Sequence, residues 1–311
     1  MNVLPRIPRA AALAGAVTVL LWASAFVGIR SATRHLEAGP LALGRLLVAA
    51  LVLGLLILIR GRSAAPRRFA PRDRAAVILC GLLWFGAYNV ALNEAERRVD
   101  AGTAAMLVNV GPILIALLAG VVLREGLPRN LAQGLAVAFA GALVIGLATR
   151  SRGSTATAGA LLCLLAALLY AGGVVAQKPA LGRQPALEVT FLACLTGLIV
   201  CLPFAPRLIT ELRHVPAGSV AWTIYLGAGP TAVAFTTWAY ALSRTTAGRM
   251  GALTYLVPPL AVVLGWVLLG EAPPAAALGG GLLCLAGVGL TRRSGTLPHR
   301  VPRPSWQRRA D

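Results

Sequence analysis

Charged residues are scarce in this sequence: Asp, Glu, Lys and Arg make up 13% of its 311 residues, and only 10 of these charged residues are acidic. Soluble domains average about 25% charged residues. Hydrophobic residues account for 58% of the chain, and the mean hydropathy is +0.77. These values exclude a soluble domain and indicate a protein with several membrane-spanning segments.

The residues needed for several kinds of chemistry are also missing. There is no Gly-x4-Gly-Lys-Ser/Thr pattern, so the chain itself does not use ATP. All three histidines (His35, His214 and His299) fall in loops or the tail, no His-Glu-x-x-His is present, and no Asp pair lies inside a span. An intramembrane enzyme is therefore not expected, nor is a metal or a cofactor.

The cysteines and the excess of basic residues do not indicate a particular chemistry. The five cysteines lie inside apolar runs at scattered spacings, which suits neither a disulfide framework nor a zinc site. The net charge of +19 comes from Lys and Arg in short loops and tails rather than on one amphipathic face. This distribution favours membrane orientation over nucleic-acid binding.

What the chain does have is an internal repeat. Shifting the register by 146 residues places Ala101-Gly102 on Ala247-Gly248, Pro112 on Pro258 and Glu125 on Glu271. The stretch between Asp100 and Glu125 has about 24 residues and so reaches about 36 Å, enough to cross a ~30 Å hydrocarbon layer. A period this long indicates a duplicated half-protein.

Apolar runs predict ten membrane spans, five in each copy. A basic N-terminal tail (1–9) precedes the first repeat (10–148), and a polar linker (149–157) leads to the second (158–291), which a basic, disordered C-terminal tail (292–311) follows. The predicted spans are 10–29, 41–59, 75–95, 101–123, 131–148, 158–177, 187–204, 220–242, 248–269 and 275–290.

Basic residues predict the orientation. With the N-terminus in the cytoplasm, 20 of the 29 Lys and Arg residues lie inside, so both termini are expected to be cytoplasmic. Because each repeat has an odd number of spans, the second copy is then inverted relative to the first. Inverted repeats are typical of secondary transporters, which hold substrate near the midplane between the repeats.

Particular motifs resemble the EamA family of the drug/metabolite transporter superfamily. They are Trp22-Ala-Ser-Ala-Phe, Arg45-Leu-Leu, Ala91-Leu-Asn before Ala101-Gly102, Pro112 and Leu123-Arg-Glu125, with second copies at Ala241-Leu-Ser, Ala247-Gly248, Pro258-Pro259 and Leu268-Leu-Gly-Glu271. The resemblance covers about residues 10–292 and implies ten spans and transport. It does not imply a particular cargo, and the charged run after Asn93 departs from the family pattern.

Polar and aromatic residues inside the spans are the candidates for substrate binding, because such groups are costly in lipid. Asn89 and Asn93 share one helix face, with Tyr88 on an adjoining face, and Asn109 and Tyr255 each lie one turn before a repeated proline. Hydrogen bonding between helices is the alternative for these amides. The full predicted set is Trp22, Tyr88, Asn89, Asn93, Asn109, Tyr170, Thr237, Tyr240 and Tyr255.

Other polar positions receive a structural interpretation. Arg45 is expected to snorkel to the headgroups, since it lies about five residues inside its span, with a substrate role as the alternative. Glu125 and Glu271 are expected to be interface anchors, and no carboxylate is predicted to lie deep in a span. Small residues at every fourth position from Gly134 to Gly146 favour close helix packing, either within the chain or in a homodimer.

Pro112 and Pro258 are predicted to bend helices at matching depths and to serve as hinges. Together these features predict a transporter of the cytoplasmic membrane, most consistent with an exporter of small organic metabolites such as amino acids, working by alternating access. Its partners are then the bilayer and a small-molecule substrate. A lipid flippase subunit, with Arg45 and Glu37 at headgroup level, and a non-transporting receptor remain alternatives.

Overall fold

The computed structural model describes residues 9–60, 69–122, 129–150, 153–244 and 254–292. All regular structure within these ranges is helical. The predictions for the two tails, for Glu125 and for Ala247-Gly248 lie outside the described residues.

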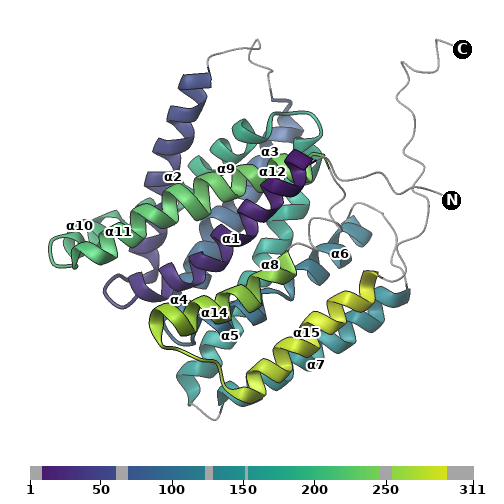
Figure 1. The fold of residues 1–311 in the computed structure, drawn as a ribbon. Coiled ribbons are helices and arrows are strands. Elements are labelled where there is room, and N and C mark those ends of the chain that lie inside the picture. Colours follow the sequence, from purple (N-terminus) through teal and green to yellow (C-terminus); the bar gives the residue numbers. More distant parts are fainter. Residues whose placement is uncertain (1–8, 61–68, 123–128, 151–152, 245–253, 293–311) are drawn as a thin grey trace, which may run out of the picture.

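Figure 1 shows the helices of the two halves. In the first half they are α1 (Arg9–Ala32), α2 (Ala38–Arg60), α3 (Pro71–Cys80), the π-helix η1 (Gly81–Ala87), α4 (Tyr88–Glu96), α5 (Ala101–Val108), α6 (Gly111–Val122) and α7 (Arg129–Arg150). In the second half they are α8 (Ser154–Leu181), α9 (Ala186–Cys201), the 3-10 helix η2 (Leu202–Phe204), α10 (Ala205–Leu212), α11 (Ala217–Leu226), the π-helix η3 (Gly227–Val233), α12 (Ala234–Leu242), the 3-10 helix η4 (Thr254–Leu256), α14 (Val257–Leu269) and α15 (Ala275–Arg292).

The element bounds repeat with the same register as the sequence. The continuous unit α3–η1–α4 begins at Pro71 and ends at Glu96, and α11–η3–α12 begins at Ala217 and ends at Leu242, a shift of 146 residues at both ends. The π-helices start at Gly81 and Gly227, again 146 residues apart. Each half thus contains a π-helix, a rare form that often marks functional sites, at the same internal position.

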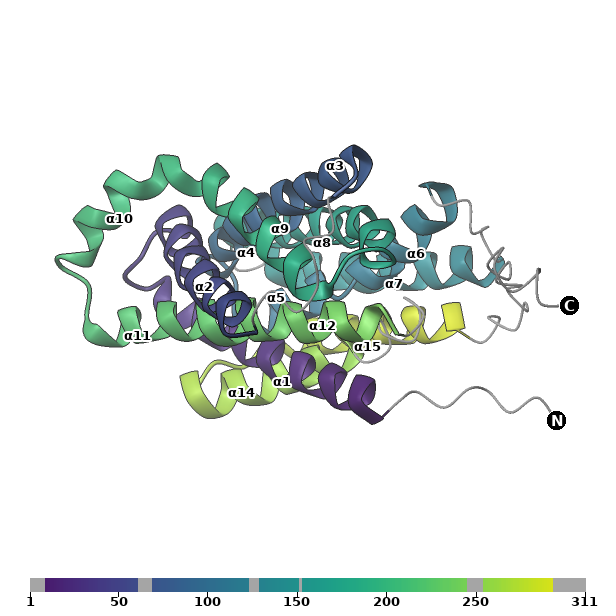
Figure 2. The same cartoon turned by 90° about the horizontal axis from the view of Figure 1, so that it is seen from above.

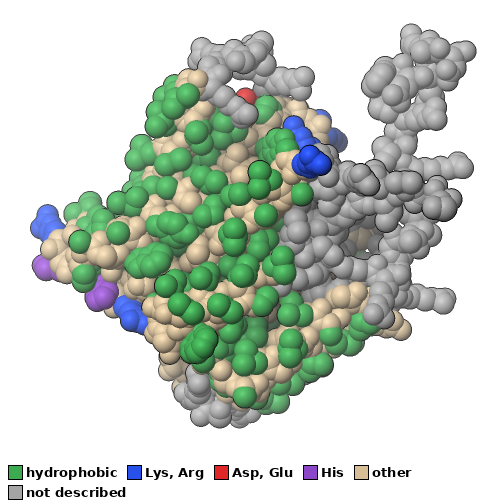
Figure 3. All heavy atoms as spheres, viewed as in Figure 1, with side chains coloured by type: hydrophobic (Ala, Val, Ile, Leu, Met, Phe, Trp, Pro, Cys, Tyr) green, Lys and Arg blue, Asp and Glu red, His purple; other side chains and the backbone are tan. Residues whose placement is uncertain are grey.

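Six helical segments among the described residues are long and apolar enough to cross a membrane. They are Arg9–Ala32, Ala38–Ile59, Pro71–Glu96, Ala101–Val122, Ser154–Leu181 and Ala186–Leu212, with Val257–Leu269 and Ala275–Gly287 as shorter apolar helices. Large hydrophobic side chains such as Leu51, Leu58, Leu161 and Trp266 are more than half exposed. In Figure 3 hydrophobic side chains cover much of the face shown, as a lipid-facing surface requires.

The two halves interlock. Helix α1 packs against α12 and α14 of the second half, and its counterpart α8 packs against α4 and α6 of the first. Helices α7 and α15 form the most extensive pair, and they lie side by side in Figure 1. A Cβ on Gly141 would lie 2.5 Å from the carbonyl oxygen of Gly280, so small residues bring these two backbones together within one chain.

The π-helices also make close crossings between the halves. A Cβ on Gly81 would lie 2.6 Å from the carbonyl oxygen of Ala193 and 2.5 Å from Cβ of Thr196 in α9. A Cβ on Gly227 would lie 2.6 Å from the carbonyl oxygen of Arg45 and from Cβ of Val48 in α2. In η3, Pro230 has no N–H that could donate to the carbonyl of Leu226, four residues earlier. The Thr231 hydroxyl donates to that carbonyl, at 2.7 Å.

Two local features differ from the sequence prediction. The span predicted to end at Phe204 continues through η2 into α10, because Pro203 and Pro206 occupy first-turn positions where proline is tolerated. The prolines predicted to bend continuous helices instead begin new ones. Pro112 is the second residue of α6 and Pro258 the second residue of α14, and a turn at Asn109 and Val110 separates α5 from α6.

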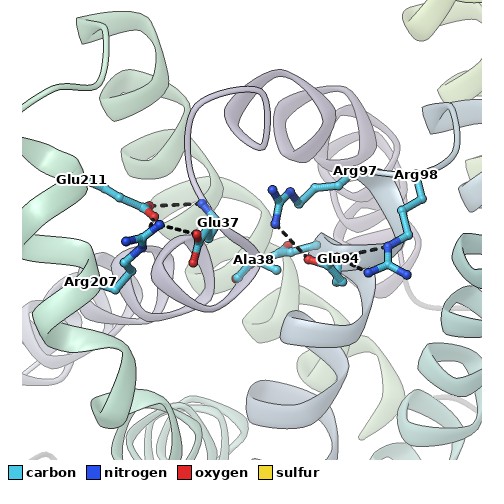
Figure 4. Close-up of polar contacts among 8 residues, drawn as sticks. Glu37, Ala38, Glu94, Arg97, Arg98, Arg207 and Glu211 are labelled. Atoms are coloured by element: carbon cyan, nitrogen blue, oxygen red, sulfur yellow. Dashed lines mark hydrogen bonds and ion pairs between the residues drawn. The ribbon is translucent and has the colours of Figure 1, made fainter. Parts of the chain in front are cut away.

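Ion pairs join the halves at both ends of the bundle. At the end formed by the α1–α2 and α4–α5 turns, Arg30 binds Glu271 at 2.9 Å, and Arg207 of α10 binds Glu37 at 2.6 Å (Figure 4). At the opposite end, Asp73 of α3 binds Arg183, which raises the pKa of that arginine through their hydrogen bonds. In Figure 2 the first residues of α1 and the last of α15 lie on one side of the molecule, opposite the α10–α11 end.

Candidate functional site

A cavity lies at the centre of the bundle, between the two halves. Its volume, counted as the space open to the centres of water molecules, is about 60 Å³. Helices α1, α2, α4, α5, α6, α8, α12 and α14, together with η1 and η4, contribute the lining. The lining residues are Trp22, Ala25, Phe26, Ile29, Arg45, Trp84, Tyr88, Leu92, Ala105, Val108, Asn109, Pro112, Tyr170, Phe235, Thr254 and Val257. This space suits a small ligand.

Aromatic rings form much of the wall. The ring centroid of Trp22 lies 6.0 Å from that of Trp84, 6.3 Å from that of Tyr170 and 5.6 Å from that of Phe235. Trp84 also stands 4.6 Å from Phe235 and 5.0 Å from Tyr170, by centroids. Such a cluster of rings offers apolar contact, and its π faces attract a cation such as an ammonium group.

Arg45 brings a positive charge into this wall. Only 3% of the residue is exposed, so the prediction that it snorkels to the headgroups is wrong. Its Nε and Nη2 atoms donate to Oγ1 of Thr231 in η3, at 3.2 and 3.0 Å. Its Nη1 atom is buried without a hydrogen-bond partner. A buried guanidinium with an unused donor beside a cavity is a site for an anionic group, with carboxylate the best geometric match.

Asn109 supplies a second unused donor. It is the C-cap of α5, where the α5–α6 span is interrupted, and its Nδ2 atom is buried with no hydrogen-bond partner. Pro112, also in the lining, begins the next helix. The interruption therefore exposes a polar side chain at cavity depth, which is where irregular backbone is tolerated in membrane transporters.

Four of the nine predicted binding residues border the cavity: Trp22, Tyr88, Asn109 and Tyr170. Asn89 and Asn93 do not border it. The Asn89 amide donates to the carbonyl of Phe85 at 2.7 Å, and the Asn93 amide donates to that of Ala38 at 3.0 Å. The Asn93 bond joins two helices, as in the alternative interpretation, whereas the Asn89 bond stays within the continuous α3–η1–α4 unit. A binding role for both stays a prediction.

The remaining predicted residues lie elsewhere. Thr237 meets Thr18 of α1 at 2.8 Å between hydroxyl oxygens, which ties α12 to α1. The Arg244 guanidinium lies over the Tyr240 ring near the end of α12, with its Cζ atom 3.7 Å from the ring centroid. Tyr255 lies in η4 at the edge of the described residues, and its side chain falls outside them. A binding role for these three also stays a prediction.

Sequence analysis missed three lining residues with chemical character: Arg45, Trp84 and Phe235. A signal for Trp84 was present, since it precedes Tyr88 by one turn, whereas nothing in the sequence set Phe235 apart from the other apolar residues of its helix. For Arg45 no periodicity separates a lipid-facing from a cavity-facing position, because nearly every other residue of α2 is apolar.

An all-helical bundle with an apolar outer face, several helices long enough to span a bilayer and a central cavity between two related halves defines a multi-pass membrane transport protein. Its family follows from comparison: the EamA-like transporter family model matches residues 9–147 and 157–293, and the chain belongs to that family.

Curated relatives carry transporter names. The chain is 39% identical over 277 residues, 89% of its length and 91% of the relative's, to a probable terminal-alkyne amino-acid exporter of Streptantibioticus cattleyicolor. It is 30% identical to the uncharacterized transporter YdfC of Bacillus subtilis, with 87% of each chain covered. A probable amino-acid metabolite efflux pump of Salmonella typhimurium is 27% identical over 66% of this chain and 71% of its own.

A solved crystal structure has the same fold. It superposes with a TM-score of 0.63 at 22% identity, covering 91% of this chain and 97% of the other. At this identity the likeness bears on the fold alone.

Proposed function

We propose that the chain is a secondary transporter that exports small amino acids with apolar side chains across the cytoplasmic membrane. The observation that carries this proposal is the buried Arg45, whose Nη1 atom has no hydrogen-bond partner, in the lining of a cavity walled by aromatic rings. A substrate carboxylate pairs with Arg45, its ammonium group lies against a ring face, and its side chain contacts the remaining rings. The names of two relatives, an amino-acid exporter and an amino-acid metabolite efflux pump, support the same substrate class.

The proposed mechanism is alternating access by two inverted halves. In this topology residues 10–148 and 158–291 each supply five spans, joined by the linker 149–157, and both termini are cytoplasmic. Support comes from the matching element bounds, from the cavity between the halves, and from the ion pairs that close both ends of the bundle. Rocking of one half against the other exchanges which set of ion pairs is broken.

A flippase is less well supported. That alternative needed Arg45 and Glu37 together at headgroup level, beside a lateral opening. Instead Arg45 is buried at the cavity, and Glu37 is paired with Arg207.

Transport is tested with purified protein in liposomes preloaded with unlabelled L-propargylglycine, a small α-amino acid with a terminal alkyne. Tracer L-propargylglycine or norvaline added outside is expected to accumulate transiently by counterflow. Its decarboxylated analogue, but-3-ynylamine, and its deaminated analogue, 4-pentynoic acid, should be exchanged much more slowly. If no protein-dependent counterflow of either amino acid occurs while labelled phospholipid is flipped, the exporter proposal fails and the flippase replaces it.

Alanine at Pro112 or Pro258 is expected to slow transport about tenfold, through a barrier higher by about 1.4 kcal/mol. The alanine N–H restores a donor to the carbonyl four residues earlier, Val108 in the first half, and so favours one continuous helix over two short ones. Expression should be unchanged.

Accessibility labelling from the two sides of the membrane reads the effect. The two substitutions should bias the protein toward opposite facing states, because the halves are inverted. Pro259→Ala, next to Pro258 but exposed, serves as the matched control. A shift in the same direction for both prolines would leave them as packing residues only.

A further inference from the structure

Glu96 is a buried acid that neither the packing nor the proposed substrate contacts account for. It is the last residue of α4, it is 0% exposed, and both of its carboxyl oxygens lack a hydrogen-bond partner. No role was predicted for Glu96, which directly follows the predicted span 75–95. An acid held in this way is costly to charge, and in membrane proteins such groups commonly serve in ion pathways.

Glu96 lines neither of the two water-accessible spaces of the bundle, but its neighbours along the chain line both. Leu92, one turn earlier on α4, lines the central cavity, whereas Val99 and Asp100, just after α4, line a polar pocket at the Arg30–Glu271 end of the bundle. The volume of that pocket, counted in the same way, is about 410 Å³. Neighbouring residues of α1 divide likewise, with Ile29 lining the cavity and Arg30 lining the pocket.

The charged and titratable groups around Glu96 come from five other segments. Those that interact with it electrostatically are Arg30 of α1, Arg45 of α2, Tyr88 of α4 itself, Asp100 before α5, Cys163 of α8 and Glu271 after α14. Most of the charged members already have partners. Arg30 donates from Nε to Glu271 and from Nη1 to the backbone carbonyl of Glu96, at 2.7 Å, and Asp100 accepts from Thr103. The Glu96 carboxyl group remains available for a proton.

We infer that Glu96 is the proton-binding residue that couples export to proton entry. This inference rests on the proposed function. When the site opens outward, the Glu96 carboxylate takes a proton from water in the polar pocket at the Arg30–Glu271 end and becomes a neutral acid. When it opens inward, the acid gives that proton to water in the central cavity, so one proton enters in each cycle.

The charge balance with Arg45 gives the reason for exchange. With Glu96 ionised, Glu96 and Arg45 together have no net charge, and a zwitterionic amino acid meets a negative group that attracts its ammonium end. With Glu96 protonated, the site has a net positive charge that repels the ammonium end. Proton uptake from outside therefore favours substrate release there, and proton loss inside favours substrate binding.

Two measurements on the same liposomes separate coupling from transport. The first is counterflow of L-propargylglycine at equal pH on both sides. The second is L-propargylglycine movement driven by an imposed pH gradient alone. In Glu96→Gln the ratio of gradient-driven to counterflow transport should fall by about tenfold or more, because glutamine keeps the shape but cannot bind a proton.

Glu94→Gln is the matched control. Glu94 lies two residues away, is partly exposed and pairs with Arg97 and Arg98 (Figure 4), so its ratio should stay at the wild-type value. If wild-type protein shows counterflow but no response to the gradient, or if Glu96→Gln keeps the wild-type ratio, the coupling role is overturned while the exporter proposal stands. Absence of counterflow in wild-type protein overturns the exporter proposal itself.

Discussion

The substitution Arg45→Met is expected to lower the counterflow of L-propargylglycine about 100-fold. A charge-assisted contact between guanidinium and carboxylate contributes about 3 kcal/mol, which corresponds to roughly two factors of ten in affinity. Methionine keeps an unbranched, buried side chain of similar length. Arg45→Lys should give an intermediate loss, since an ammonium group retains the charge but cannot bind Thr231 and a carboxylate with one planar fork.

The substrate analogues decide whether the loss is specific. But-3-ynylamine has no carboxylate that could pair with Arg45. Its slow counterflow should therefore differ little between wild-type protein and Arg45→Met. Arg213→Met, at an exposed arginine, controls for the change in net charge. If the amine and the amino acid lose the same factor, Arg45 serves only to hold α2 on η3.

The second large effect is expected at the glycines that begin the π-helices. Alanine at Gly81 or at Gly227 places a Cβ about 2.6 Å from a backbone carbonyl oxygen of the facing helix, which cannot move away as a flexible side chain could. Overpacking of this kind costs about 1–3 kcal/mol. We therefore expect each substitution to lower the Tm of detergent-solubilised protein by roughly 5 °C.

Gly279→Ala is the matched control for these glycines. Gly279 lies within α15, and a Cβ there meets nothing within 4 Å, so alanine should leave the Tm unchanged or raise it slightly. The measurement is thermal unfolding followed by tryptophan fluorescence. Equal stability of Gly81→Ala and Gly279→Ala would mean that the α9–η1 crossing relaxes without cost, contrary to the prediction.

The sequence was most informative where a single residue type recurs at one register. The 146-residue shift found from the prolines reappears in the bounds of α3–η1–α4 and α11–η3–α12. Trp22 and Tyr170, which align at a slightly different shift of 148 residues, meet in the cavity wall. Asn109, the polar residue one turn before Pro112, borders the cavity, and its Nδ2 atom has no hydrogen-bond partner.

Burial of charged residues was the part that sequence could not give. Arg45 lies near the end of its apolar run, so distance along the helix suggested a headgroup position, and Glu96 directly follows the end of its run. Their burial depends on which helices cover them: η3 covers Arg45, and Arg30 of α1 contacts the backbone at Glu96. The π-helices were also invisible, because their glycines and apolar residues are equally compatible with an α-helix.

The interlocked arrangement of α1 has a consequence for biosynthesis. Its hydrogen bond to Thr237 joins residues 219 apart in the chain, and its ion pair to Glu271 joins residues 241 apart. At a translation rate of about 5–20 residues per second, α1 enters the bilayer roughly 10–50 s before these partners exist. During that interval Thr18 must rely on the carbonyl of Ala14 and Arg30 on headgroups, and a chaperone or insertase that shields α1 would raise the yield of folded protein.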